Sequence, residues 1–319
     1  MNLIISVDTE ADNQWDRNKG PSVTLDNLAA IPRFQELCTY WGFPPTYLLT
    51  YEVATSSSAK TLGDYQKAGS AEVGAHLHPW TTPPFISDTE KLRRDFPNNL
   101  PPEQFKSKLK SLTTAIETGT GRRPTSFRAG RWGFAPWMTS YLINEGYTVD
   151  SSISPQIDWS LPKFREETGT GPNFSTTITI NPYYLQDDTG RRLLEVPVTV
   201  APIGIIRKID SKLFTLVKGI RTNNLRTLTE RTMIRPRWCR IFRETTLDDL
   251  IKIYESAHDN KSLVLVFMIH SSELITGSPY TKTETEVEHV FATLGSFLSE
   301  MKHNGVNGGK LSDLPKLFN

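Results

Sequence analysis

Cysteine is scarce in this sequence, which has only Cys38 and Cys239, far apart along the chain. This scarcity excludes a disulfide framework and a zinc site built from paired Cys-x-x-Cys motifs. Lysine and arginine number 36 against 35 aspartates and glutamates, so no overall charge imbalance points to nucleic acid. No apolar run approaches the roughly 18 residues of a membrane-spanning helix, and we find no internal repeat.

The first residues, MNLIISVDTEAD, have no basic n-region and become acidic after about one strand. They do not resemble a secretory signal peptide, so we expect a cytoplasmic protein. A length of 319 residues allows one large α/β domain or two smaller ones.

Short β-rich runs alternate with helix-length segments along most of the chain. Several runs are apolar throughout, as expected of strands buried on both faces of a parallel sheet. The predicted strands are 3–8, 46–50, 71–76, 126–130, 147–152, 193–199 and 263–270. The predicted helices are 24–42, 102–121, 135–147, 245–258 and 284–305, with Pro32 expected to kink the first or to begin a second turn. The alternation indicates a βα barrel or a doubly wound sheet.

Residues 155 to about 243 interrupt this alternation with a stretch rich in proline, glycine and threonine, followed by a basic segment. From Arg207 to Arg243 there are eleven lysines and arginines against two acidic residues. Such a segment could bind phosphate groups, lie against an anionic membrane surface, or form a solvated pair of basic helices.

Polar side chains recur where the predicted strands end, and in βα architectures functional groups gather at the carboxyl ends of parallel strands. These residues are Asp8, Glu10, His76, His78, Arg128, Asp150 and His270. If the strands are neighbours in the sheet, these carboxylates, imidazoles and the guanidinium would lie together at the carboxyl ends of the strands. That set is typical of a metal-assisted hydrolase.

Each residue also has an ordinary explanation. Asp8 and Glu10 could cap a turn, and Arg128 could form a structural ion pair. The pair His76 and His78 could be surface or core histidines, and a His-x-His motif alone is a weak signal. Residues two apart on a strand point the same way, however, so both rings can converge on one ion. If there were no functional site here, all of these ordinary explanations would have to be true at the same time.

Five segments, in order, resemble the five motifs of the polysaccharide deacetylases of the NodB-homology class, which are metal-dependent carbohydrate esterases. They are Ser6-Val7-Asp8-Thr9-Glu10, EVGAHLHPW from Glu72 to Trp80, Arg128 to Gly133, Asp150, and Met268-Ile269-His270. The resemblance implies a distorted (β/α)7 barrel as a single domain over residues 1–319. Residues 155–243 would be an irregular basic insertion before the last strong strand.

The sequence departs from the family at two metal positions. Thr9 stands where the family has its metal-binding aspartate, and Trp80 stands where it has its second histidine. A branch of the family has D-x-E and H-L-H-P-W motifs instead. In this pattern Glu10 and His78 would replace the two missing metal ligands. The resemblance thus implies that Glu10, His76 and His78 hold a divalent metal, zinc in the first place.

By the same resemblance Asp8 would be the general base, oriented by Arg128, and His270 would be the general acid, tuned by Asp150. Aromatic residues after the motifs could stack on sugar faces or equally well pack beneath loops, and Glu273 is either a supporting group or a helix-start acid. The candidate substrate-binding residues are Trp80, Arg131, Trp132 and Glu273, with Trp137 as a further aromatic residue.

We therefore hypothesise a cytoplasmic enzyme, at the inner face of the membrane, that removes an N-acetyl group from an amino sugar. The substrate would carry a nucleotide or lipid pyrophosphate, as in surface polysaccharide or lipopolysaccharide biosynthesis, because residues 207–243 could bind phosphate or membrane. One alternative is a C–N hydrolase of a small amide or ureide on the same barrel. Another is a non-catalytic glycan-binding relative.

Overall fold

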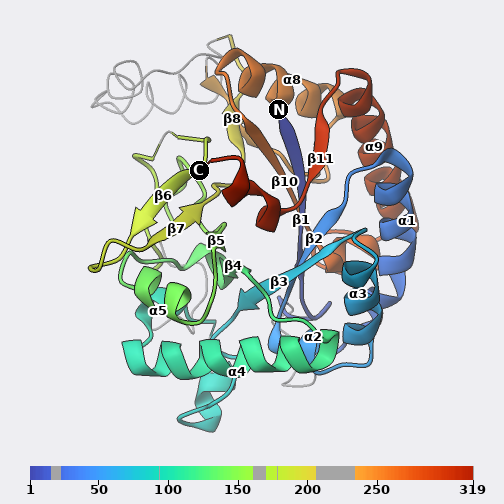
Figure 1. The fold of residues 1–319 in the computed structure, drawn as a ribbon. Coiled ribbons are helices and arrows are strands. Elements are labelled where there is room, and N and C mark those ends of the chain that lie inside the picture. Colours follow the sequence, from blue (N-terminus) through green and yellow to red (C-terminus); the bar gives the residue numbers. More distant parts are fainter. Residues whose placement is uncertain (16–22, 93, 161–169, 178, 206–233, 319) are drawn as a thin grey trace.

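The computed structural model of the chain describes residues 1–15, 23–92, 94–160, 170–177, 179–205 and 234–318. Within them, seven strands run parallel in the order β10-β1-β2-β3-β4-β5-β7, and β6 joins β7 antiparallel. These strands are β1 (Asn2–Thr9), β2 (Pro45–Leu49), β3 (Glu72–Leu77), β4 (Ser126–Ala129), β5 (Val149–Asp150), β6 (Tyr183–Gln186), β7 (Arg192–Glu195) and β10 (Val264–His270). The sheet curls around a central space, as Figure 1 shows.

Helices cover the outer face of the curled sheet (Figure 1). They are α1 (Ile31–Trp41), α2 (Tyr51–Ala54), α3 (Ser58–Lys67), α4 (Pro102–Thr120), α5 (Met138–Asn144), α8 (Leu247–Asp259) and α9 (Glu284–His303). Every residue of β3 and of β10 is buried, because helices cover one face and the interior of the curl is filled by side chains. No helix among the described residues combines the length and the apolar composition needed to cross a membrane.

Several short strands and 3-10 helices complete the structure. Strand β11 (Asn307–Gly309) pairs with β1, and β8 (Val200–Pro202) pairs with β9 (Pro236–Trp238) in a separate two-stranded sheet. The 3-10 helix η7 (Leu311–Lys316) lies against the amino ends of β2 and β3, where the backbone N–H of Ser312 donates to Glu72. The remaining 3-10 helices are η1 (Asp26–Ala30), η2 (Asp88–Leu92), η3 (Pro97–Asn99), η4 (Gly130–Trp132) and η6 (Ser271–Leu274).

The structure confirms the α/β class and the seven-stranded barrel-like sheet, with local differences. Residues 24–42 form two elements, η1 and α1, because Pro32 in the first turn of α1 has no N–H to continue a preceding helix. The strand expected at 193–199 ends at Glu195, two residues before Pro197. Since β7 pairs with β5 and β6 pairs with β7, the range 155–243 is not purely an insertion but contributes two strands to the main sheet.

Most of the basic segment lies outside the described residues, which exclude 206–233. Of its arginines the structure describes Arg235, Arg237, Arg240 and Arg243. Arg240 is buried, and it lies beside the functional site described next.

Candidate functional site

Parallel pairing brings the carboxyl ends of β10, β1, β3 and β4 to one edge of the sheet. Asp8 is the register partner of His270 on β10, and His76 on β3 is the partner of Arg128 on β4. The side chains predicted from the five motifs therefore do converge, with the exception of Asp150.

Glu10, His76 and His78 form a buried cluster, in which one possible ligand atom from each lies within 4.8 Å of the others. Nε2 of His78 lies 3.1 Å from Oε2 of Glu10, and Nε2 of His76 lies 3.7 Å from the same oxygen. Nδ1 of His76 lies 3.1 Å from the carbonyl oxygen of Arg128, so this nitrogen donates its hydrogen and Nε2 presents its lone pair to Glu10. This is the orientation that a metal-binding imidazole requires.

The protonation states also suit a divalent metal. Burial lowers the pKa of His76 to about 4, although the Asp8 carboxylate acts in the opposite direction. Burial likewise lowers the pKa of His78 well below its ordinary value. Both rings are therefore neutral near pH 7, which is the form that binds metal. Two imidazoles and a carboxylate match the ligand types of zinc, so these residues fit the expected ion.

Neighbouring residues hold Glu10 in place. The indole Nε1 of Trp15 donates to Oε1 of Glu10 at 2.6 Å, and Nε2 of Gln14 donates to Oε2 at 3.1 Å. The backbone N–H of Glu10 donates to the Ser271 hydroxyl, which follows β10. Burial raises the pKa of Glu10, with a further contribution from the nearby Asp8 carboxylate, so a cation between Glu10 and the imidazoles would favour its charged form.

Asp8 and Arg128 form a buried ion pair beside the cluster. Nη1 of Arg128 donates to Oδ1 of Asp8 at 2.6 Å, while Nε and Nη2 bond to Ser151 and Nη2 also bonds to Ser6. Burial alone would raise the pKa of Asp8, but Arg128 and the histidines around it together hold that pKa below its usual range. The second carboxylate oxygen, Oδ2, faces His76 at 3.8 Å and His270 at 3.9 Å.

His270 ends β10 with its two ring nitrogens in different surroundings. Nε2 lies 3.9 Å from Oδ2 of Asp8 and 4.0 Å from Oε1 of Glu10. Nδ1 lies 3.0 Å from Oε1 of Glu273 in η6. Glu273 also pairs with the buried Arg240 at 2.8 Å. Sequence reasoning missed Arg240, because it was one of eleven basic residues in a segment without a recognisable motif.

Asp150 does not lie beside His270 as expected; Glu273 holds that place. Asp150 is the register partner of Glu195 on β7, and it accepts a hydrogen bond from Ser152. Burial raises the pKa of Asp150 to about 6, and burial together with the Asp150 carboxylate raises the pKa of Glu195 well above its usual range. The reason is topological, since β5 and β10 are separated by four strands in the sheet.

The expected substrate-binding residues of the loops are packed rather than open. Trp80 lies against His78 with ring centres 4.3 Å apart, and Trp132 lies over the Arg128 guanidinium at 5.1 Å. Arg131 is buried against Phe96. For the two tryptophans, packing beneath loops is thus what the structure shows, and contact with a substrate stays a prediction.

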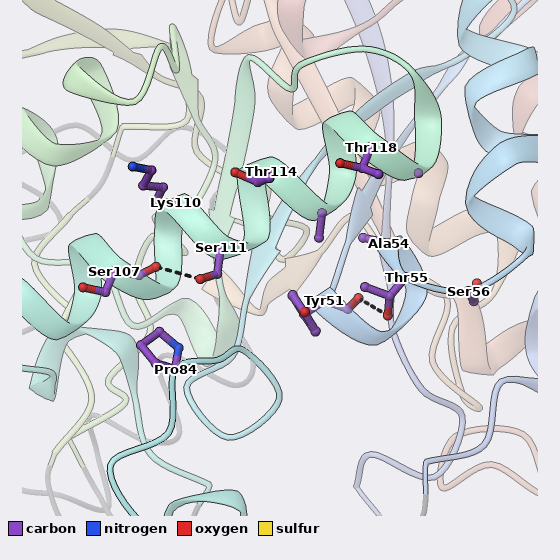
Figure 2. A pocket seen from close by; sticks show the side chains of 12 residues that line it. Tyr51, Ala54, Thr55, Ser56, Pro84, Ser107, Lys110, Ser111, Thr114 and Thr118 are labelled. Carbon is purple, nitrogen blue, oxygen red and sulfur yellow. Dashed lines mark hydrogen bonds between the residues drawn. The ribbon is translucent and has the colours of Figure 1, made fainter.

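A separate depression of about 770 Å³ lies between α2 and α4. Figure 2 shows that hydroxyl side chains of α4, including Ser107 and Thr118, face it together with Lys110, while Tyr51 of α2 and Thr55 directly after α2 line it from the other side. Neither a carboxylate nor an imidazole is among its lining residues. It therefore adds no catalytic group to the site at the strand ends.

No protein-family model matches the chain, and a sequence search finds no match among curated proteins. Solved structures do match. A protein described as a polysaccharide deacetylase from Mycobacterium smegmatis superposes with a TM-score of 0.54 and 16% identity, covering 98% of this chain and 89% of that one. The chain has the fold of that polysaccharide deacetylase.

Proteins with other activities share this fold. PuuE allantoinase matches with a TM-score of 0.53 and 14% identity, covering 99% of this chain and 88% of its own. The 4-alpha-glucanotransferase from Thermococcus litoralis matches with a TM-score of 0.55 and 14% identity, covering 100% of this chain but 40% of its own. Identities this low show the fold alone, so the activity has to be argued from the site.

Proposed function

We propose that this protein is a metal-dependent hydrolase that removes the N-acetyl group from an acetylated amino sugar. The observation that carries this proposal is the buried Glu10, His76 and His78 cluster, placed beside the Asp8–Arg128 pair and His270. A divalent ion, with zinc as our first choice, would polarise the acetamide carbonyl and lower the pKa of water when bound.

The residues of the chain have distinct tasks in this reaction. Arg128 occupies Oδ1 of Asp8, which leaves Oδ2 to take a proton from the attacking water. His270 directs Nε2 into the same space from β10, where it would protonate the leaving amine. Glu273 at Nδ1 holds the ring in this orientation. The products are acetate and a free amino sugar.

The substrate proposal rests on the basic residues of 207–243. Arginine side chains bind phosphate in a two-point manner, so we propose a sugar linked to a nucleotide or a lipid pyrophosphate. Such substrates belong to surface polysaccharide and lipopolysaccharide biosynthesis, which would place the enzyme in the cytoplasm at the inner face of the membrane. Residues 206–233 lie outside the described part, so this step is argued from composition.

The test combines metal analysis with acetate release. Purified protein should contain about one equivalent of a divalent metal, and the zinc-loaded form should release acetate from UDP-N-acetylhexosamines or lipid-linked acetylated saccharides. Glu10→Gln should lose both properties, whereas His289→Gln, at an exposed histidine of α9, should keep both. Metal-free protein, or zinc-loaded protein that releases no acetate from either panel, would count against the proposal.

A second candidate is hydrolysis of a small amide or ureide, which is supported by the shared fold with PuuE allantoinase. Chelation separates the two candidates, because our first proposal depends on the metal. Hydrolysis of allantoin that is unaffected by EDTA would favour the second candidate.

A further inference from the structure

Arg240 contacts both the candidate acid and its carboxylate partner. Its Nη2 lies 2.8 Å from Oε1 of Glu273 and 2.9 Å from Nδ1 of His270. The same Glu273 oxygen accepts the backbone N–H of His270 at 2.8 Å. A guanidinium has donors only, so the carboxylate is the natural acceptor for Nη2, and the Glu273 oxygen is held from two sides.

Tyr280 fixes the plane of the same imidazole. The rings of Tyr280 and His270 are stacked, with centres 5.0 Å apart and planes 7° from parallel. The Arg240 guanidinium carbon lies 4.8 Å from the centre of the Tyr280 ring. Arg240 therefore supports His270 through Glu273 at Nδ1 and through Tyr280 at the ring face.

The backbone around Arg240 is tied to the sheet. Arg240 lies two residues after β9, and the neighbouring Cys239 bonds through its backbone to Thr199 before β8 and to Met268 on β10. The guanidinium is thus delivered by a segment that is joined to the strand bearing His270. A buried guanidinium costs free energy through lost hydration, so a purely structural role could be met by a large apolar residue instead.

We propose that Arg240 is a positioning residue that sets the orientation of His270 by holding Glu273. With Nδ1 turned to Glu273, Nε2 must face Asp8 and Glu10, where a leaving amine would be protonated. The catalytic part of this inference rests on the proposed hydrolase function. The orientation itself does not depend on that function, so it can be tested without a substrate.

A surface cavity of about 480 Å³ reaches this assembly. Glu273 and Tyr280 line it, together with Phe242 and the exposed Arg243. The cavity offers a small cation a route to the place that the Arg240 side chain would leave. Free guanidinium can therefore be added to a variant with a truncated Arg240 side chain, so that it replaces the missing group.

The first experiment is ¹⁵N NMR of the histidine side chains, with the His270 signals assigned by comparison with His270→Gln. Arg240→Gln should shift the His270 signals, while Arg243→Gln, which removes an exposed arginine of the same cavity, should leave them in place. Arg240→Lys keeps the charge and should give an intermediate shift if Arg240→Gln does not fold. Unchanged His270 signals in a folded Arg240 variant would overturn the proposal.

The second experiment measures kinetics with the acetylated sugar that the wild type hydrolyses. Arg240→Ala should lower kcat by at least tenfold with KM nearly unchanged, because the buried Arg240 pairs with Glu273 and is not one of the arginines of 207–243 that we expect to bind phosphate. Guanidinium chloride should restore part of kcat, and sodium chloride at the same ionic strength should not. A change in KM without a change in kcat, or no rescue of kcat by guanidinium in a folded variant, would contradict the inference. An inactive wild type with NMR shifts as expected would contradict only the proposed function.

Discussion

Glu52 lies at the carboxyl edge of the sheet, and its burial there changes the pKa of its carboxyl group. It follows the carboxyl end of β2 in the short helix α2, and its carboxylate oxygens are buried. Burial raises the pKa of Glu52 to about 7, although Thr50 and Thr81 close by act in the opposite direction. This carboxyl group is therefore largely neutral in the folded protein at slightly acid pH. In the unfolded chain it is charged under the same conditions.

The raised pKa of Glu52 predicts a pH-dependent stability difference. Its contribution to the free energy of unfolding is fully present below about pH 4.5 and is lost as pH rises through 7. Glu52→Gln removes this loss. The free energy of unfolding of the variant, relative to that of the wild type, should therefore rise by about 2 kcal/mol between pH 5 and pH 8. Urea denaturation at several pH values measures the gain. Glu36→Gln, on the exposed face of α1, should show none, and an equal result for both variants would refute the prediction.

At the scale of elements, the loop after β3 is held by a buried lysine of α4. Nζ of Lys108 donates to the carbonyl oxygens of Pro79, Thr82 and Pro84 at 3.0, 2.6 and 2.7 Å, and it pairs with Glu90 at 2.9 Å. This loop begins directly after His78. One ammonium group thus connects a long outer helix to the loop that follows His78 of the candidate metal site.

Lys108→Met should be strongly destabilising, because it leaves three carbonyl groups and the half-buried Glu90 without their common donor. We expect a loss of about 3 kcal/mol in the free energy of unfolding, together with weaker metal binding. The control is Lys106→Met on the same helix, an exposed residue that pairs only with the exposed Glu103 at 3.7 Å among the described contacts. Equal stability of the two variants in urea denaturation would be inconsistent with the role of Lys108.

The turn after β4 passes so close to His78 that only glycine fits at position 130. A Cβ added to Gly130 would lie 2.6 Å from Cε1 of His78 and 2.6 Å from the Leu77 carbonyl oxygen. The backbone of the third motif at Gly130 therefore packs directly against the His78 ring of the second motif. The third motif therefore shapes the candidate metal site of Glu10, His76 and His78, although none of its side chains belongs to that site.

Gly130→Ala should push the His78 ring away from Glu10 and lower metal affinity by about 10- to 100-fold. Metal titration measures the change. Gly295→Ala in α9, where the nearest atom to a new Cβ is a Leu37 methyl at 3.5 Å, should leave the affinity as it is. If Gly130→Ala binds metal as tightly as the wild type, the proposed crowding of His78 is wrong.

For the molecule as a whole, the sequence predicted what depends on local pattern. Apolar runs located the seven strands, and polar residues at their ends located Asp8, Glu10, His76, Arg128 and His270. It could not locate contacts that depend on how distant segments pack. Examples are the pairing of Glu273 with Arg240, whose segment carried only a charge signal, and the register pairing of Asp150 with Glu195, which follows from strand order.

Metal binding should stabilise the whole fold, because the proposed ligands lie at the carboxyl ends of β1 and β3, which β2 separates in the sheet. At a free zinc concentration 100 times the Kd, the free energy of unfolding should rise by about 2.7 kcal/mol. Thermal unfolding with zinc and with EDTA measures the difference. Glu10→Gln should show no such rise, and a wild type with the same Tm in zinc and EDTA would argue against the metal centre.

The pairing of β1 with β10 has a consequence for the synthesis of the protein. The Ser271 hydroxyl bonds to the carbonyl oxygen of Glu10 across 261 residues of sequence. At about 5 to 20 residues per second, roughly 15 to 50 s of translation separate the two. A nascent chain contains Glu10, His76 and His78 while His270 is still to be made. In terms of the proposed function, the residues proposed to bind the metal are made long before the proposed acid, so activity requires that β10 has been synthesised.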